Sequence, residues 1–110
     1  MIFKRKLRHV LVESTKEVDF RSRALWEEMK GSMARTMGEA EYFRANPSVA
    51  AAFTNNVFVF TVNRGHERSL VLALSFIKSL GNEKIGFYTI KISGTIRSLR
   101  TAYKKLYGPA

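Results

Sequence analysis

The chain has 110 residues, with 19 Lys and Arg against nine Asp and Glu, so its formal net charge is +10. A chain of this length is expected to form one domain with a single modest core. It contains no cysteine, which excludes a disulfide scaffold, a thiolate metal site and a cysteine nucleophile. No apolar stretch is long enough to span a membrane, and no signal peptide is recognisable, so we expect a cytoplasmic protein.

The first part of the chain predicts a strand followed by a helix. Residues 7–15 alternate between apolar and polar side chains and are rich in Leu and Val, which indicates a strand. Asp19 is placed to cap a helix that runs to about Met37 and ends at Gly38. Residues 39–47 give no clear pattern and receive no assignment.

The rest of the chain predicts a hairpin, a helix, a strand and a last helix. These elements are expected at 48–54, 57–63, 66–80, 84–92 and from 95 to about 107. Asn55 and Asn56 join the first two strands, and Asn tolerates the positive φ of a tight hairpin.

The element order βαββαβ followed by a helix predicts an α+β, ferredoxin-like sandwich with a four-stranded antiparallel sheet. The first and third strands would be central and the last strand would lie at an edge. The C-terminal helix would pack on an edge or on the open face of the sheet. The helix at 66–80 is expected to stop at Gly81 and Asn82. Its apolar stripe of core residues consists of Leu70, Ala73, Leu74, Ile77 and Leu80. Val71, Leu72 and Phe76 make this helix apolar well beyond one face. We therefore expect it to be buried on two sides or to contact a partner.

The positive charge is concentrated at the two ends of the sequence. All acidic residues lie between Glu13 and Glu83, where basic residues match them in number. The excess occupies Lys4, Arg5, Lys6, Arg8, Lys84, Lys91, Arg97, Arg100, Lys104 and Lys105. If the fold brings the ends together, they form one basic surface, which is typical of a nucleic-acid-binding protein. The alternative is a basic surface that only keeps the protein soluble.

No residue pattern indicates a catalytic or metal site. The two histidines belong to different elements, and no metalloprotease, EF-hand, nucleophile-elbow or phosphate-loop motif occurs. His9 alternates with apolar residues of the first strand, so we interpret it as structural. His66 stands where a helix begins and suits a first-turn or capping role. We expect no catalytic residue and no cofactor bound by the protein itself.

The stretch ISGTIRSLR brings a glycine turn, a helix start and arginines together. Ser93 or Thr95 can cap the last helix, and Gly94 allows a tight turn. The first-turn N–H groups then point outward with the positive end of the helix dipole, which attracts anions. A stripe of cations adjoins the apolar face of this helix, at Arg97, Arg100 and Lys104. The alternative is an ordinary turn with solvated arginines, and with the uneven charge we favour phosphate binding.

Phe58 and Phe60 lie on one face of the strand at 57–63. RNA-recognition-motif domains use such a pair to stack on bases. This chain lacks the glycine and the leading cation of that strand motif, and its first strand has no aromatic partner. We interpret both rings as core residues. A stand-alone module that binds single-stranded RNA on these rings stays an alternative.

Three stretches resemble the ribonuclease P protein component 2 family, small archaeal subunits related to eukaryotic ribonuclease P and MRP proteins. They are FKRKLRHVLVE at 3–13, VFVFTVNRGHERSLVLAL at 57–74 and IKISGTIRSLR at 90–100. With the element order and the length, the resemblance covers nearly the whole chain. The chain departs from the family's pattern at His9, where a tyrosine is common, and over 38–50.

The resemblance implies a ribonucleoprotein subunit that supports removal of 5′ leaders from precursor tRNA, with catalysis carried by the RNA and its Mg²⁺ ions. Ribonuclease P RNA would be the direct partner and precursor tRNA an indirect one. The expected RNA-binding residues are Lys4, Arg5, Lys6, Arg8, Ser93, Gly94, Thr95, Arg97, Arg100 and Lys104.

The resemblance also implies a protein partner, the barrel-shaped ribonuclease P protein component 3, in a two-plus-two assembly. Val71, Leu72 and Phe76 on the apolar helix offer this partner a contact surface. A remaining alternative from another class is a ferredoxin-like interaction or regulatory domain, which would show little affinity for RNA.

Overall fold

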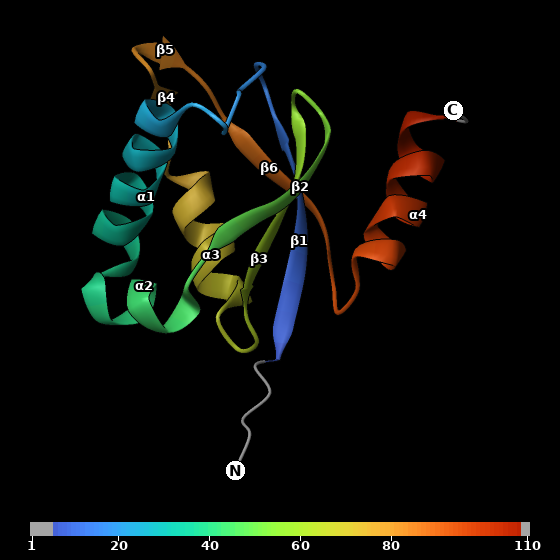
Figure 1. Cartoon of the computed structure of the whole chain (residues 1–110), viewed down its shortest axis with the longest axis horizontal. Coiled ribbons are helices and arrows are strands. Elements are labelled where there is room, and N and C mark those ends of the chain that lie inside the picture. Colours follow the sequence, from blue (N-terminus) through green and yellow to red (C-terminus); the bar gives the residue numbers. More distant parts are fainter. Residues whose placement is uncertain (1–5, 109–110) are drawn as a thin grey trace.

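A four-stranded antiparallel sheet in the order β2-β3-β1-β6 forms the centre of the fold (Figure 1). Its strands are β1 (Leu7–Ser14), β2 (Ser48–Thr54), β3 (Val57–Asn63) and β6 (Phe87–Ser93). The computed structural model describes residues 6–108, so Lys4 and Arg5 lie outside the described residues. The central β1 and β3 and the edge strand β6 confirm the expected ferredoxin-like topology.

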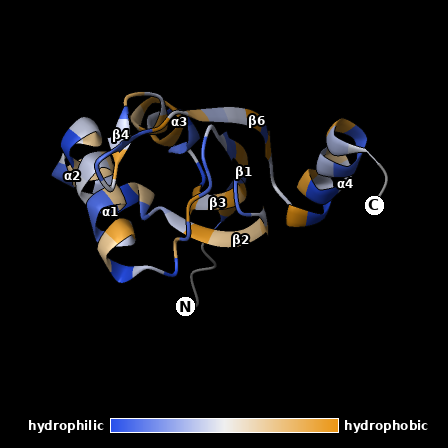
Figure 2. Cartoon of the chain, turned by 90° about the horizontal axis from the view of Figure 1, so that it is seen from above, coloured by the Kyte–Doolittle hydropathy of each residue, from blue (hydrophilic) through white to orange (hydrophobic). Residues whose placement is uncertain are grey.

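The helices place the sheet in the middle of three layers. One face carries α1 (Arg23–Met37) and α3 (Glu67–Ser75), with the short α2 (Glu39–Ala45) beside them. The other face carries α4 (Ile96–Tyr107). Figures 1 and 2 show α4 standing apart from the other helices across the sheet. The last helix therefore packs on the open face, which is one of the two positions expected from the sequence.

The two central strands are buried on both faces. Side chains alternate between the faces of a strand, so neighbouring residues enter different cores. Val10 and Val12 join the core under α1 and α3, whereas Leu11 packs with Leu99 of α4. The register of β1 with β3 runs without interruption from Leu7 to Glu13. This double burial explains why β3 reads as a continuous apolar run.

Phe58 and Phe60 belong to the larger of the two cores. Their side chains are 1% and 0% exposed, and the ring of Phe20 packs edge-on against both at 4.7 and 5.8 Å. Edge-to-face packing of this kind is favourable between aromatic rings. No base can stack on these two rings in the folded protein, so the expectation that they form core is confirmed and the alternative built on them is wrong.

The edges of the sheet are less regular than its centre. The register of β1 with β6 shifts between Leu11 and Val12, so β6 holds an extra residue there. The pairing of β2 with β3 shifts twice, between Val49 and Ala51 and again between Ala52 and Thr54. Such bulges bend an edge strand and increase its twist.

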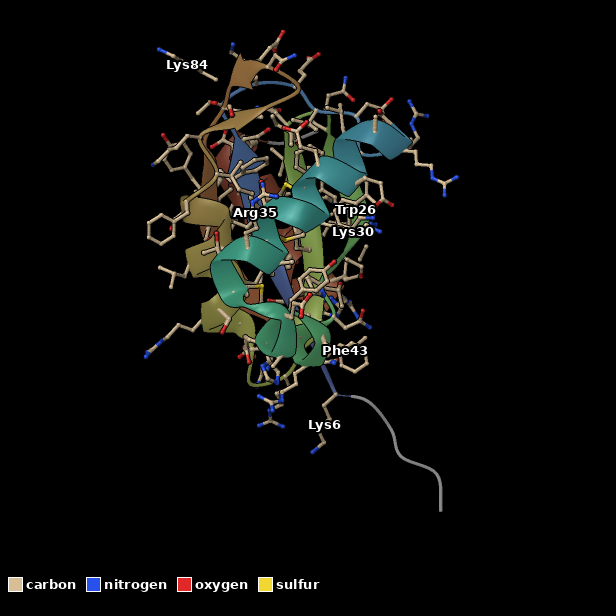
Figure 3. The ribbon with its side chains drawn as sticks, turned by 90° about the vertical axis from the view of Figure 1, so that its left-hand side faces the viewer. Lys6, Trp26, Lys30, Arg35, Phe43 and Lys84 are labelled. Carbon is tan, nitrogen blue, oxygen red and sulfur yellow. The ribbon has the colours of Figure 1, made fainter. Side chains whose placement is uncertain are left out.

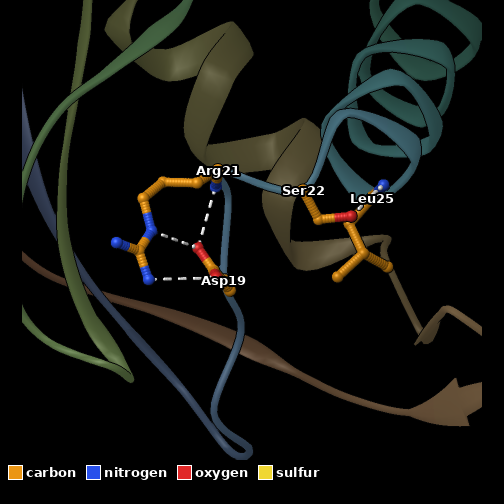
Figure 4. Close-up of polar contacts among 4 residues, drawn as sticks. All are labelled: Asp19, Arg21, Ser22 and Leu25. Carbon is orange, nitrogen blue, oxygen red and sulfur yellow. Dashed lines mark hydrogen bonds and ion pairs between the residues drawn. The ribbon is translucent and has the colours of Figure 1, made fainter.

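Ser22, and not Asp19, caps α1 (Figure 4). The Ser22 hydroxyl accepts a hydrogen bond from the Leu25 N–H at 3.4 Å. Asp19 instead accepts from the backbone N–H of Arg21 at 2.9 Å and from its guanidinium at 3.0 and 3.2 Å. These local contacts close a turn ahead of the helix, which is the usual competing use of an aspartate side chain. The helix therefore begins later than the sequence predicted.

Residues 39–47, which received no assignment, contain α2. Gly38 ends α1 as expected, with φ of 87°, and α2 begins at the next residue. The first turn of α2 holds Glu39 and Glu41 and the last holds Arg44, which is the charge order that the helix dipole favours. Seven residues are too few to show a clear hydrophobic period, so this helix could not be predicted from the sequence.

The prediction of a helix from 66 to 80 is wrong beyond Ser75. The chain turns after α3 and forms a small hairpin from β4 (Ser79–Leu80) and β5 (Glu83–Lys84). Gly81 and Asn82, which we took for a helix stop, have φ of 60° and 66°, the conformation of a tight hairpin turn. A side chain at Gly81 would also clash, because its Cβ would lie 2.9 Å from Leu25.

The last strand consequently begins at Phe87 and not at residue 84. Ile77 and Leu80 are nevertheless 5% exposed, so the apolar stripe identified core residues correctly while the helix assignment failed. The hairpin between β2 and β3 is confirmed at Asn55 and Asn56. Among the described non-glycine residues, only Asn46 and Asn82 have a positive φ. The prediction that Asn55 and Asn56 adopt positive φ in this turn is therefore wrong.

Packing of α4 on the sheet predicts a sharp difference between two of its leucines. Leu99 is 0% exposed, so Leu99→Ala is expected to lower the free energy of unfolding by about 2–5 kcal/mol. Leu106 is 62% exposed, and Leu106→Ala is expected to change it by about 0.5 kcal/mol or less. Urea denaturation followed by circular dichroism measures both. Equal losses would contradict the docked position of α4.

Candidate nucleic-acid interface

The two basic ends of the chain meet where β1 begins and β6 ends. The register pairs His9 with Ser93 across these strands, and α4 starts just beyond (Figure 1). A Cβ built on Gly94 would lie 3.3 Å from Nη1 of Arg8, so the guanidinium rests against the glycine backbone. The absence of a side chain at Gly94 permits this close approach. The fold thus joins the N-terminal and C-terminal cations at one turn.

This turn and the first turn of α4 present free positive charge. Thr95 caps α4, because its hydroxyl accepts from the Ser98 N–H at 3.2 Å. Ser93 holds the turn itself by accepting from the Thr95 N–H at 3.2 Å. The first turn of α4 contains no acidic residue. The positive end of the helix dipole therefore adds to the Arg8 guanidinium.

The cations of α4 have different surroundings. Arg97 is exposed in the first turn of the helix, and Lys104 is exposed further along. The guanidinium of Arg100 lies 5.4 Å from the centre of the Phe53 ring on β2, which is a cation–π contact. Arg100 therefore helps to seat the helix on the sheet. Arg97 is the exposed cation of this stripe that lies in the first turn of α4, next to the turn at Gly94.

Aromatic contacts hold the C-terminal half of α4. Tyr103 packs edge-on against Phe53 at 5.1 Å and stacks on Tyr107 at 4.9 Å. Burial and a hydrogen bond to Glu13 of β1 raise the pKa of Tyr107 to about 12. With Leu99 buried below, these contacts keep α4 at a fixed position on the sheet. The cations of its first turn are thus carried by a firmly held element.

A second group of cations lies at the same end of the sheet, around the turn from β3 to α3. The Arg64 N–H donates to the carbonyl oxygen of Lys6 at 2.9 Å. The Asn63 amide donates to the carbonyl oxygen of Arg44 at 2.6 Å. A shallow depression is lined by Lys6, Asn63, Arg64 and Gly65. The fold therefore brings Lys6, Arg44 and Arg64 to one region, although they come from three separate parts of the chain.

The sequence pointed to Lys6 but not to Arg44 and Arg64. Both belong to the middle of the chain, where acidic and basic residues balance, so the charge count concealed them. The basic turn after the strand at 57–63, Asn63-Arg64-Gly65, is the signal that could have identified Arg64. Arg44 could not be found in this way, because α2 itself was not recognised.

Acidic residues near this turn are occupied by internal contacts. The Glu41 carboxylate lies 2.7 Å from Nδ1 of His66, and hydrogen bonds from Ser69 and His66 hold the pKa of Glu41 below its ordinary value. The Glu67 carboxylate accepts from the Gly65 N–H. His66 stands at the N-cap of α3, as expected, but its side chain pairs with α2 and makes no capping bond.

His9 has a structural contact within the sheet. Its Nδ1 lies 2.8 Å from the Thr61 hydroxyl on the neighbouring strand. Partial burial lowers the pKa of His9. The arrangement confirms the structural interpretation of this histidine.

Some cations of the two ends lie far from this region. Figure 3 shows Lys84 at one end of the molecule and Lys6 at the other. Lys84 belongs to the β4–β5 hairpin, and that hairpin stands at the opposite end of the sheet from the start of β1 (Figure 1). The expectation of a single basic surface is therefore wrong for Lys84, whereas Arg8 and the turn at Gly94 do lie together.

The expected contact surface for a protein partner divides into exposed and packed residues. Leu72 and Phe76 of α3 and its following turn are 54% and 60% exposed. Val71 is half-buried and packs against the larger core. Leu72 and Phe76 are thus available for an external contact, whereas Val71 is partly used by the core.

The described residues contain no group of three or more His, Asp or Glu side chains placed to hold a metal ion. Within residues 6–108, no helix has the length and apolar character needed to cross a membrane.

Residues 7–104 match the model of the Rpp14/Pop5 family, whose designation names ribonuclease P. The chain belongs to the Rpp14/Pop5 family. It is thereby a member of a family of ribonuclease P and MRP protein subunits. No match is found among curated proteins. A chain of the cryo-EM structure of yeast ribonuclease MRP has the same fold, with a TM-score of 0.64 and 10% sequence identity over 97% of this chain and 95% of that chain.

The residues that match the family include β1 with Arg8, the turn from β3 to α3 and the first turns of α4. The alignment with the chain of yeast ribonuclease MRP extends over nearly the whole of this chain. At so low an identity this likeness concerns the fold alone.

The cap of α4 gives a direct test of the turn. Thr95→Ala removes the hydroxyl that accepts from Ser98, and it is expected to lower the free energy of unfolding by about 1 kcal/mol. Thr95→Ser keeps a hydroxyl and is expected to retain most of that stability. Chemical denaturation of the two variants measures the difference. Losses of the same size in both would show that the hydroxyl does not cap the helix.

The contact between Tyr107 and Glu13 predicts an alkaline loss of stability. The phenol ionises near its ordinary value of 10.0 in the unfolded chain and at about 12 in the folded one. Between these values the unfolded chain has released a proton that the folded chain retains, so rising pH favours unfolding. The stability present below pH 10 should fall as the pH approaches 12. Tyr107→Phe should reduce this slope in denaturation measurements, and an unchanged slope would contradict the contact.

Proposed function

We propose that this chain is a protein subunit of ribonuclease P, located in the cytoplasm, that supports the catalytic RNA in removing 5′ leaders from precursor tRNA. Membership in the Rpp14/Pop5 family over residues 7–104 carries this proposal. The position of Arg8 beside the turn that leads into α4 supports it, because cations at a helix start would suit phosphates of an RNA.

The proposed role of the protein is electrostatic and architectural. Arg8, the N–H groups at the start of α4 and Arg97 would bind phosphates of the ribonuclease P RNA. Backbone contacts of this kind fix position and orientation without reading sequence. They suit folded RNA, whose helices present phosphates and hide base edges. Catalysis would belong to the RNA and its Mg²⁺ ions, and the chain's cations would lower the repulsion between phosphates that those ions otherwise screen.

We further propose that Leu72 and Phe76 contact a protein partner, the ribonuclease P protein component 3. These two side chains lie on the outer side of α3, away from the start of α4. A protein and an RNA could therefore bind at the same time. Exposed apolar residues that lie together are typical of protein contact sites. Precursor tRNA would interact indirectly, through the RNA that the chain supports.

Arg97 gives the sharpest test of RNA binding. Arg97→Ala is expected to weaken binding to ribonuclease P RNA and to reduce the slope of log K against log salt by about one unit. Arg23→Ala is the matched control, because Arg23 is also an exposed arginine in the first turn of a helix but lies on α1. Filter binding over a series of salt concentrations measures both. Identical slopes for Arg97→Ala and the unchanged protein would remove α4 from the RNA contact.

Reconstitution tests the function as a whole. Ribonuclease P RNA and the component 3 partner would be mixed with and without this chain, and cleavage of precursor tRNA followed at limiting Mg²⁺. We expect cleavage to depend on the chain, with the mixture that lacks it close to the rate of RNA alone. If the chain adds nothing and binds neither RNA nor partner, the proposal fails in favour of a ferredoxin-like interaction domain with another role.

A further inference from the structure

Phe43 on α2 is an aromatic side chain that the fold does not use. It is 84% exposed, the most of any large hydrophobic residue in the described part of the chain. The neighbouring Tyr42 packs against the larger core, and Ala45 is 0% exposed. The short helix is therefore held to the protein by other residues. Its exposed ring contributes nothing to that packing and is free for an external contact.

Hydrogen bonds hold the part of α2 that carries Phe43 next to the turn from β3 to α3 and its cations. Phe43 directly precedes Arg44, whose carbonyl oxygen accepts from the Asn63 amide at 2.6 Å. Asn63 precedes Arg64, whose N–H donates to the carbonyl oxygen of Lys6 at 2.9 Å. These two hydrogen bonds tie together the three parts of the chain that carry the cations. Figure 3 shows Phe43 and Lys6 at the same end of the molecule.

We infer that this region binds an unpaired nucleotide of RNA, with the base stacked on Phe43 and the adjoining phosphates held by Lys6, Arg44 and Arg64. The inference rests on the proposed function in that RNA is the ligand. Every base offers a flat face that can stack on an aromatic ring, and cations beside the ring hold the backbone. Arg44 lines the same hollow as the Phe43 ring, and Lys6 and Arg64 line the depression at the adjoining turn. An exposed ring with cations nearby is complementary to a nucleotide, which combines an aromatic face with negative charge.

The geometry favours a single-stranded segment over a helix. Bases within an RNA helix are stacked on one another, so only an unpaired base can reach an isolated ring. Glu39, one helical turn before Phe43, lines the hollow beside the ring. Its carboxylate repels phosphates from that side. The backbone of the bound segment would therefore run on the Arg44 side of the ring.

This site is distinct from the turn at Gly94. In Figure 1 the start of β1 lies between α2 and the start of α4. The first turn of α4 offers only N–H groups and arginines, which bind phosphates of any RNA strand. The region at α2 adds an aromatic face. The same end of the sheet thus carries one surface for backbone and one for an unpaired base.

Binding of a short single-stranded oligoadenylate to the full chain tests the inference. Phe43→Leu keeps an apolar side chain but removes the ring, and it is expected to weaken binding by at least about fivefold, within the range measured for loss of one base–aromatic stack. Phe43→Trp keeps a ring and is expected to bind at least as tightly as the unchanged protein. A fully paired RNA hairpin is the control probe, and neither substitution should change its affinity.

A fluorescence measurement reports the stack directly. Phe43→Trp in a Trp26→Phe background gives the chain a single indole, whose emission should be quenched when oligoadenylate is added. Leu106→Trp in the same background is the matched control, since Leu106 is also an exposed apolar residue on a helix. Circular dichroism confirms that the background folds. If both indoles respond alike, the inference is overturned.

The outcomes separate this inference from the proposed function. If Phe43→Leu binds oligoadenylate as well as the unchanged protein, the base site is absent, and an accompanying loss of partner binding would make Phe43 a protein contact instead. In that case a weakened Arg97→Ala variant would still support the ribonuclease P role. If the unchanged protein binds no RNA of either kind, both proposals fail together.

Discussion

The burial of β1 and β3 on both faces is the constraint on which the rest of the molecule depends. Because α1 and α3 cover one side and α4 the other, these strands have no face left for a ligand. Polar and charged groups are displaced to the ends of the strands and to the outer sides of helices. An end of the sheet, and not its surface, therefore becomes the place where several elements can bring cations together.

The order and direction of the strands bring the cations together at this end of the sheet. Antiparallel pairing places the start of β1 beside the end of β6 and the end of β3, so residues from distant parts of the chain meet there. Arg8 reaches Gly94 by this route, and Lys6 reaches Arg64. The turn at Gly94 leaves room for the Arg8 guanidinium, and Thr95 caps the helix that starts beside it. The geometry of the interface thus follows from strand pairing that the apolar cores already require.

The sequence predicted the sheet and the two cores well, because alternation and helical spacing report burial directly. Leu70 and Leu74 were placed in the core from spacing alone and are at most 1% exposed. It was harder to predict which polar side chain caps a helix. Asp19 and Ser22 are both good caps, and the contact of Asp19 with Arg21 decided between them. Such a contact depends on the turn that it helps to form.

The candidate site was predictable only where one segment carried all of its chemistry. The stretch from Ser93 to Arg97 contains a helix cap, a tight turn and a cation, and each could be predicted from the sequence. Arg44, Arg64 and Phe43 gave no comparable signal, because their proximity depends on hydrogen bonds between α2, β3 and the start of β1. Charge counted along the sequence cannot detect such a group when acidic residues lie nearby in the chain and their carboxylates are taken up by internal contacts.

The irregular edges of the sheet bear on how copies of this protein behave at high concentration. A flat exposed edge strand is a template for strands of other molecules and a common origin of aggregation. Here β6 has a bulge opposite Leu11 and Val12 and exposes Lys91, while β2 is interrupted twice along its pairing with β3. These breaks oppose sheet-to-sheet growth between molecules. Association is thereby left to side chains on the helices and strand ends, where it can be specific.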